Sequence, residues 1–285
     1  MTDAAPAAPE AIDTPVFRLQ RGTAPLLVSI PHLGTLIPAD LLGQYSAAAD
    51  LRADTDWHLD RLYGFAAEWG ASVLCAKVSR YVIDLNRPAS GESLYPGQTT
   101  TGLCPTETFT GEPLYPAGGE PDAAELARRI DVYWQPYHLA LRAELDRLLA
   151  LHGQVLLWEA HSIASRLPRL FDGKLPDLNF GTHEGRACDA ALLDAVLAAL
   201  PAADATGSGA LPGLTHVVNG RFKGGYITRH HGEPARGIHA IQLEKCQCLY
   251  MDEAPPFGYR PDRAAQLQPV LRALLQAALG HLAGR

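Results

Sequence analysis

The stretch VLLWEAHSI (Val155–Ile163) indicates the fold class, because it contains an apolar run of strand length that is followed by polar residues. Residues 155–159 suit a strand that is buried on both faces, and His161 follows it. Leu26–Ile30 is a second run of this kind, with His32 just beyond its end. Such runs alternate with helical patterns, which predicts an α/β protein with a mainly parallel, mixed sheet and helices on both faces.

The other expected elements follow from periodicity and turn residues. Compact apolar runs predict strands, and apolar residues at three- and four-residue steps predict helices. Strands are expected at Ser72–Ala76, 81–85, His216–Val218 and 238–243, and helices at 57–69, 123–151 (bent at Pro136), 186–200 and 263–282. Segment 86–116 is rich in Gly, Pro and Thr without periodicity, so we expect a long loop, and loops of this length are often functional.

Length and composition indicate one globular unit. The chain has 285 residues, of which 47% are hydrophobic and 19% charged, and this balance is typical of folded proteins. Neither a repeat nor a linker divides the sequence. We expect residues 1–14, which are rich in Ala and Pro, to form a flexible tail, and residues 15–285 to form a single domain.

Charge and cysteine usage disfavour several classes of protein. The 24 Lys and Arg against 31 Asp and Glu give a formal net charge of −7, which disfavours nucleic-acid binding through a basic surface. Five scattered cysteines disfavour a disulfide scaffold. No signal-peptide pattern and no bilayer-spanning run is recognisable. These features together predict a cytoplasmic protein.

Polar residues at strand ends are the candidates for a site, because ligands bind beyond the carboxyl ends of strands in α/β sheets. His32 and His161 are candidate metal ligands, since a catalytic zinc site takes three protein ligands and keeps one open position. A third ligand is expected from DTDWHLD (54–60), although Asp54 and Asp56 equally suit a helix N-cap. The alternative for each histidine is a hydrogen-bonded structural role.

The segment SRYVIDLNR (79–87) is a second group of candidates. Strand alternation would place Arg80, Asp84 and Asn86 on one face. Arg87 offers a planar fork for a carboxylate. The alternative is an internal Arg80–Asp84 ion pair with Arg87 at the surface.

Two later segments complete the set. Glu244 follows an apolar run and is either a solvated strand end or a carboxylate directed at the site. The segment NGRFKGGYITRHHG (219–232) carries Arg221, Lys223 and Arg229 among glycines. We interpret it as a basic loop able to hold an anionic substrate, and the alternative is a solvated loop.

Taken together, these segments resemble the N-formylglutamate amidohydrolases, the N-formylglutamate deformylases of histidine degradation. The resemblance runs from about Ser29 to Glu253 and rests on SIPHLGTLIP, DTDWHLDRLY, SRYVIDLNRP, GLCPTETFTGEPLY, WEAHSI, NFGTHEG, GRFKGGYITRHHG and HAIQLEKCQCLYMDE. That family is similar in turn to zinc carboxypeptidases and to the aspartoacylase and succinylglutamate desuccinylase group. The resemblance implies a phosphorylase/hydrolase-like, zinc carboxypeptidase-like α/β fold that holds one zinc ion, although another divalent metal is an alternative.

The resemblance also implies a set of zinc ligands. His32 and His161 match the two zinc histidines of the superfamily. Its carboxylate ligand usually lies three residues after the first histidine, and this chain has Thr35 there. The third ligand must therefore come from elsewhere, and we favour Asp56 over Asp54.

The remaining roles follow from the same resemblance. Arg80, Asn86 and Arg87 match the residues that bind the substrate carboxylate and the oxyanion, and Glu244 matches the general base. The expected reaction is hydrolysis of N-formyl-L-glutamate, a small dianion, to formate and L-glutamate, with Arg229 holding the second carboxylate. Alternatives are a deacylase for another N-acyl amino acid and a non-catalytic carboxylate-binding module. We expect a monomer or a small homo-oligomer.

Overall fold

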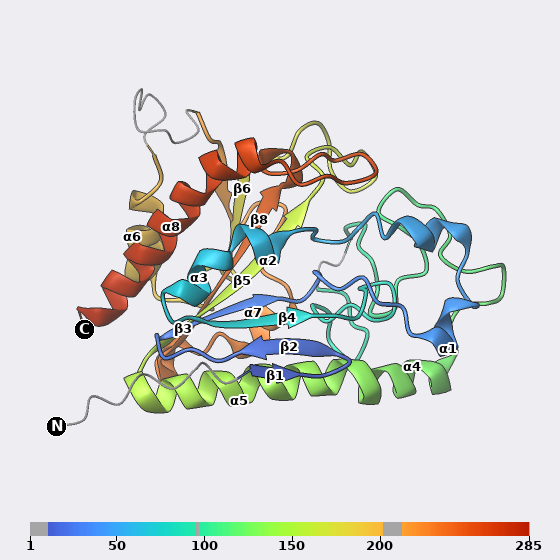
Figure 1. Cartoon of the computed structure of the whole chain (residues 1–285), viewed down its shortest axis with the longest axis horizontal. Coiled ribbons are helices and arrows are strands. Elements are labelled where there is room, and N and C mark those ends of the chain that lie inside the picture. The colour runs from blue at the N-terminus through green and yellow to red at the C-terminus, as the bar shows by residue number, and fades with distance from the viewer. Residues whose placement is uncertain (1–10, 95–96, 202–212, 285) are drawn as a thin grey trace.

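An eight-stranded mixed sheet, in the order β1-β2-β4-β3-β5-β8-β6-β7, organises the part of the chain that the computed structural model describes, residues 11–94, 97–201 and 213–284 (Figure 1). The strands are β1 (Ala11–Asp13), β2 (Phe17–Gln20), β3 (Leu26–Ile30), β4 (Ser72–Ala76), β5 (Val155–Ile163), β6 (Leu178–Gly181), β7 (His216–Val218) and β8 (Ile238–Cys246). The α-helices are α1 (Ala39–Leu42), α2 (Leu59–Leu62), α3 (Gly64–Glu68), α4 (Ala123–Arg129), α5 (Gln135–His152), α6 (Ala190–Ala198), α7 (Tyr226–His231) and α8 (Pro261–Ala283).

The centre of the sheet is parallel and its edges are mixed. β4, β3, β5 and β8 are parallel neighbours, whereas β1, β2 and β6 each have an antiparallel neighbour. The predicted α/β class with a mixed sheet is confirmed. Pairing between Ile12 and Leu19 makes 11–13 part of the sheet, so these residues of the segment predicted to be a flexible tail form a strand. Residues 1–10 of that segment lie outside the described residues.

The central strands are buried at every position because helices cover both faces of the sheet. In β3, Leu26, Val28 and Ile30 pack in a core that includes residues of α2, α3, α6 and α8. Leu27 points to the opposite face and packs in a core that includes residues of α5. Figure 1 shows α5 below the sheet and α8 above it. The apolar runs therefore mark strands between two helical layers.

The strand predicted at 81–85 is wrong, because the chain turns there. The Ser79 hydroxyl oxygen accepts a hydrogen bond from the Tyr81 N–H, and the Asp84 carboxylate accepts one from the Asn86 N–H. The N–H of Asp84 itself donates to the Leu103 carbonyl in the long loop. Such local side-chain bonds offer the backbone an alternative to strand pairing. The predicted alternation of faces does not apply here.

The helix predicted at 57–69 forms as two short helices, α2 and α3, interrupted at Tyr63. His58 occupies the N-cap position of α2 with a φ of 61°, in the left-handed region. Neither Asp54 nor Asp56 caps this helix, so that interpretation is wrong. Both carboxylates are used instead inside the protein, as described below.

The long helix predicted over 123–151 is confirmed in extent but contains an irregular turn. α4 and α5 are joined by a π-helical turn at Ile130–Trp134, which ends two residues before Pro136 in the first turn of α5. Proline lacks the N–H that a regular helix interior needs, so the change of geometry falls next to it. The helix predicted at 186–200 begins later, at Ala190, and the one at 263–282 is confirmed as α8.

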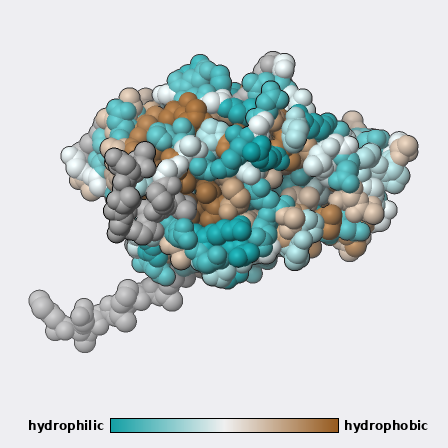
Figure 2. Space-filling view, turned by 90° about the horizontal axis from the view of Figure 1, so that it is seen from above, coloured by the Kyte–Doolittle hydropathy of each residue, from teal (hydrophilic) through white to brown (hydrophobic). Residues whose placement is uncertain are grey.

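The long loop predicted over 86–116 is confirmed, since its described residues form neither a helix nor a strand. Figure 2 shows mainly hydrophilic side chains on the face seen from above, with smaller apolar patches between them. None of the helices in the described ranges is long and apolar enough to cross a membrane.

Candidate active site

His161 and Glu244 lie side by side in the centre of the sheet. β5 and β8 continue beyond the predicted strand ends, and the two residues are direct partners in the parallel register. His32 follows β3, in which Ser29 pairs with Glu159 of β5. The carboxyl ends of three adjacent strands therefore bring these side chains to one place, where α/β proteins bind ligands.

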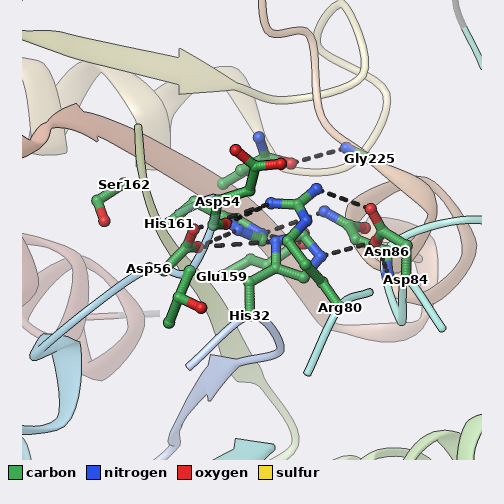
Figure 3. A network of polar contacts seen from close by, with 12 residues as sticks. His32, Asp54, Asp56, Arg80, Asp84, Asn86, Glu159, His161, Ser162 and Gly225 are labelled. Atoms are coloured by element: carbon green, nitrogen blue, oxygen red, sulfur yellow. Dashed lines mark hydrogen bonds and ion pairs between the residues drawn. The ribbon is translucent and has the colours of Figure 1, made fainter. Parts of the chain in front are cut away.

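Two histidines and one aspartate form a buried cluster at the carboxyl ends of these strands (Figure 3). One ligand atom from each of His32, Asp56 and His161 lies within 4.8 Å of the others. Asp56 Oδ2 lies 2.9 Å from His161 Nδ1 and 3.7 Å from His32 Nδ1. Asp54 does not join them, because its Oδ2 accepts a hydrogen bond of 2.8 Å from the N–H of Phe109. The preference for Asp56 over Asp54 thus agrees with the geometry.

Buried carboxylates hold the outer nitrogen of each histidine. His32 Nε2 donates to Asp84 Oδ1 at 2.7 Å, and His161 Nε2 donates to Glu159 Oε1 at 2.7 Å. Each ring is thereby oriented with its Nδ1 toward Asp56. Histidines that bind metals commonly have such carboxylate partners, which fix the tautomer and make the ligand nitrogen more basic.

The electrostatics of the cluster favour a cation. Burial opposes the ionisation of Asp56, but hydrogen bonds from His161 and His32 outweigh it and hold its pKa below the ordinary value. Burial likewise opposes the protonation of His161, but Glu159 and Asp56 outweigh it and raise its pKa to about 10. Positive charge is thus stabilised between these carboxylates. Two imidazole nitrogens and one carboxylate oxygen form a donor set that fits zinc.

Glu244 is a buried carboxyl group suited to proton transfer. Its Oε1 has no hydrogen-bond partner among the described residues. Burial raises its pKa to about 7, although the charge of His161 acts in the opposite direction. The next residue, Lys245, donates from Nζ to the His161 carbonyl oxygen at 2.6 Å and so ties β8 to β5 behind the cluster. A carboxyl group that titrates near neutral pH suits a general base.

The residues of 79–87 reach the same place through a turn rather than a strand. Arg80 Nη2 donates to Asp84 Oδ2 at 2.7 Å, so the internal ion pair exists, yet Arg80 also lines the cavity beside the cluster. Arg87 lines this cavity too, and its Nε donates to the Thr101 carbonyl at 2.8 Å. Arg87 is partly buried rather than fully at the surface, since its side chain is 16% exposed.

The cavity beside the cluster, called here the site cavity, also receives side chains from two loops. Its described lining comprises His32, Arg80, Asn86, Arg87, Thr99, Thr100, Thr101, Phe109, His161, Ser162, Ile163, Leu170, Arg221, Phe222, Gly225, Gln242 and Glu244. Arg229 is not among these residues and lines a separate cavity together with His183, Arg186 and Lys223. The position of Arg229 therefore does not support the predicted contact with the substrate. Arg221 of the same glycine-rich segment lies in the site cavity.

Sequence reasoning gave no role to Glu159 or Phe109. Glu159 shares a face of β5 with His161 two residues later, and the Thr228 hydroxyl donates to its second oxygen. That spacing was a usable signal, because alternate residues of a strand point the same way. Phe109 lies in an aperiodic loop, and its place at the site arises only from the folding of that loop.

The comparisons with known proteins agree with this geometry. A family model described as N-formylglutamate amidohydrolase matches residues 24–251. The chain belongs to the N-formylglutamate amidohydrolase family. It is 51% identical over 265 residues to the N-formylglutamate deformylase of Pseudomonas aeruginosa, covering 93% of this chain and 96% of that protein. It is 49% identical over 270 residues to the deformylase of Pseudomonas putida, covering 95% and 98%. The predicted resemblance is confirmed.

A solved structure supports the fold of this N-formylglutamate amidohydrolase family member. The crystal structure of the N-formylglutamate amidohydrolase from Ralstonia eutropha JMP134 is similar with a TM-score of 0.75 and 26% identity. The similarity covers 95% of this chain and 98% of that one. This chain therefore shares its overall fold with that enzyme.

Gly225 is expected to be essential for the position of Asn86. A Cβ on Gly225 would lie 2.3 Å from the Asn86 amide nitrogen, and Asn86 is held because its Oδ1 accepts from the Ile227 N–H at 2.9 Å. Gly225→Ala should lower kcat/KM by roughly 10–100-fold, since a displacement of about 1 Å in a site can cost about 100-fold. Steady-state kinetics and elemental analysis measure this effect, and the metal content should stay normal.

Gly64→Ala is the matched control for that variant. No described atom lies within 4 Å of a Cβ at Gly64, apart from the helix's own backbone and chain neighbours. The substitution should leave kcat/KM unchanged and stabilise helix α3 slightly. Equal activity of the two variants would show that Asn86 tolerates displacement.

Proposed function

We propose that this chain hydrolyses N-formyl-L-glutamate to formate and L-glutamate with one bound zinc ion. One observation carries the proposal: the cluster of His32, Asp56 and His161 lies beside Glu244, in a cavity lined by several arginines. The cluster provides a metal site, the buried carboxylate provides a base, and the arginines suit a substrate with two carboxylates. The names of the curated relatives support the same substrate.

His32, Asp56 and His161 would hold the metal. A zinc ion held there supplies Lewis-acid polarisation of the formyl oxygen and makes water a stronger acid. Asp84 and Glu159 keep the two imidazole rings oriented through their Nε2 hydrogen bonds. These five buried residues therefore form one preorganised unit.

Glu244 transfers the proton. Its Oε1 accepts a proton from the attacking water while the water oxygen bonds to the formyl carbon. The carbon–nitrogen bond then breaks, and Glu244 delivers that proton to the leaving amine nitrogen, so that formate and glutamate are released. A pKa of about 7 suits both halves of this cycle.

The arginines and Asn86 bind the negative charges. Arg80 stabilises the oxyanion that develops on the formyl oxygen, since it lines the cavity and is fixed by Asp84. Asn86 and Arg87 hold the α-carboxylate. Arg221, in place of Arg229, holds the side-chain carboxylate, because it lines the site cavity.

The role of Arg221 predicts a change in substrate preference. Arg221→Gln should lower kcat/KM for N-formyl-L-glutamate by roughly 10–100-fold, the range for losing a hydrogen bond to a charged group. N-formyl-L-glutamine, which lacks the side-chain charge, should be affected far less. Arg229→Gln is the matched control and should alter neither substrate by more than about threefold, within the range of substitutions away from a site. A larger effect of Arg229→Gln on N-formylglutamate alone would reverse the assignment.

The activity itself is tested by formate release from purified protein. Protein with zinc restored should release formate from N-formyl-L-glutamate, and treatment with a chelator should abolish this until metal is added back. A panel of N-formyl, N-acetyl and N-succinyl derivatives of glutamate and aspartate tests the alternative deacylases. Preference for a substrate other than N-formylglutamate would replace the proposed reaction.

A further inference from the structure

A second cavity adjoins the site cavity and shares part of its lining. Its volume is about 210 Å³, against about 60 Å³ for the site cavity. Phe109, Ser162 and Ile163 line both cavities, so these side chains are called here the shared wall. Beyond the wall, the second cavity is lined mainly by apolar side chains that include Leu167 and Phe257, and polar side chains also reach it: Asp54, Thr110, Glu112, Gln247 and Glu253. A larger and mostly apolar space thus lies directly behind the wall of the site.

Phe109 is the largest member of the shared wall and is held in place on two sides. Its N–H donates to Asp54 Oδ2 at 2.8 Å, and its ring lies 4.6 Å below the guanidinium of Arg80. The turn that carries it is closed by a hydrogen bond of 2.9 Å from the Thr108 N–H to the Glu112 carbonyl. The backbone of Phe109 is therefore anchored on one side, and its ring packs against Arg80 on the other, between the two cavities.

Phe109 lies where the acyl part of the substrate is expected. In the proposed function, Arg80 contacts the oxygen on the acyl carbon, and the ring of Phe109 stacks on Arg80. The carboxylate-binding arginines are anchored elsewhere: Arg87 donates to the Thr101 carbonyl, and Arg221 donates to the Thr99 carbonyl. The glutamate part therefore lies toward the segment 99–101, and the acyl substituent lies toward Phe109.

We infer that Phe109 sets the length of the acyl group that this enzyme accepts, by closing the site cavity from the larger, mostly apolar cavity behind it. The inference rests on the proposed function, since it places the acyl carbon at Arg80. A formyl group carries only hydrogen beyond its carbonyl carbon and fits against the ring. Each added methylene must enter the space that the ring fills, and loss of the ring opens the second cavity to it.

Phe109→Ala tests the inference through the ratio of two substrates. The ratio of kcat/KM for N-butyryl-L-glutamate to that for N-formyl-L-glutamate should rise by about 10–200-fold, the range for differences of a methylene in a hydrophobic pocket. Hydrolysis of N-formylglutamate should itself fall by about tenfold, because Arg80 loses the ring that supports it. A thermal shift gives a second readout without turnover. N-butyryl-L-glutamate should raise the Tm of Phe109→Ala and leave that of the unmodified enzyme unchanged.

Phe222→Ala is the matched control, because its ring lines the site cavity without being part of the shared wall. It should change both substrates together and leave their ratio within about threefold, below the smallest effect expected of a methylene. Ile163→Ala opens the same wall from β5 and should likewise raise the ratio of the two kcat/KM values. This variant provides the test if Phe109→Ala is unstable.

The outcomes separate this inference from the proposed function. Folded Phe109→Ala and Ile163→Ala variants that hydrolyse N-formylglutamate with an unchanged substrate ratio and no thermal shift would overturn the inference alone. Failure of the unmodified enzyme to release formate would overturn the proposed function. In that case a Tm shift by N-butyrylglutamate that is confined to Phe109→Ala would still support the role of the shared wall. The absence of such a shift would overturn the inference as well.

Discussion

Replacing His161 with alanine is expected to remove the bound metal and nearly all activity while the fold is kept. His161 supplies one of three proposed ligands, and its ring is buried between Asp56 and Glu159. Zinc should fall from about one ion per chain to well below that, because two protein ligands do not make a stable catalytic site. Activity should fall by at least about 10³-fold, since the metal contributes several kcal/mol of transition-state stabilisation. Elemental analysis and formate release measure the two losses.

Two neighbouring aspartates provide the matched comparison for the metal site. Asp56→Ala should lose metal as His161→Ala does, because Asp56 lies between the two histidines. Asp54→Ala removes a carboxylate that is also buried but accepts a hydrogen bond from Phe109, so this variant should keep stoichiometric zinc. Loss of metal from Asp54→Ala with retention in Asp56→Ala would show that the ligand is misassigned.

The sequence was sufficient to locate the candidate metal site because strand ends and ligand type coincide there. His32 and His161 each follow or end an apolar run, and parallel neighbours bring such ends to one edge of the sheet. The preference for Asp56 had no geometric basis in the sequence, since Asp54 and Asp56 have the same chemistry and lie two residues apart, and the structure supplies that basis. Only the chain path after β3 decides which carboxylate faces the histidines.

The wrong strand prediction at 81–85 and the choice of Arg229 have a common cause. Both depend on tertiary contacts, which the periodicity of the sequence does not reveal. Residues 81–85 alternate between apolar and polar types as a strand does. In the structure Asp84 accepts hydrogen bonds from His32, Arg80 and the Asn86 N–H, and the backbone forms a turn around this carboxylate. Arg229 and Arg221 both lie in a basic glycine-rich segment, and its composition does not tell which of the two side chains faces the site. Residue pattern predicted that a basic side chain would come from this segment, and the fold decides which one enters the site cavity.

Asp84 shows how one buried carboxylate links recognition to catalysis. Its Oδ1 holds His32, and its Oδ2 holds Arg80. Burial opposes its ionisation, but the charges of His32, Arg87 and Arg80 outweigh it and hold its pKa well below the ordinary value. It therefore stays charged across the neutral range, and it orients a proposed metal ligand and the proposed oxyanion donor at the same time. The ion pair between Arg80 and Asp84 that the sequence suggested thus exists, but it is not merely structural, because Arg80 also lines the site cavity.

Glu244→Gln is expected to separate proton transfer from metal binding. The amide keeps the shape of the side chain in its buried position but cannot accept a proton from water, so kcat should fall by about 10²–10⁴-fold, the usual contribution of general acid–base catalysis. Zinc content should remain normal, because the cluster of His32, Asp56 and His161 does not include Glu244. KM should change little, since Arg87 and Arg221 are untouched, and a loss confined to kcat indicates a role in the transition state. If Glu244→Gln instead lost its zinc, Glu244 would be a metal ligand rather than the base. If it kept near-full activity, the proton would have to move through another group, and the assignment of Glu244 would fail at the chemical step.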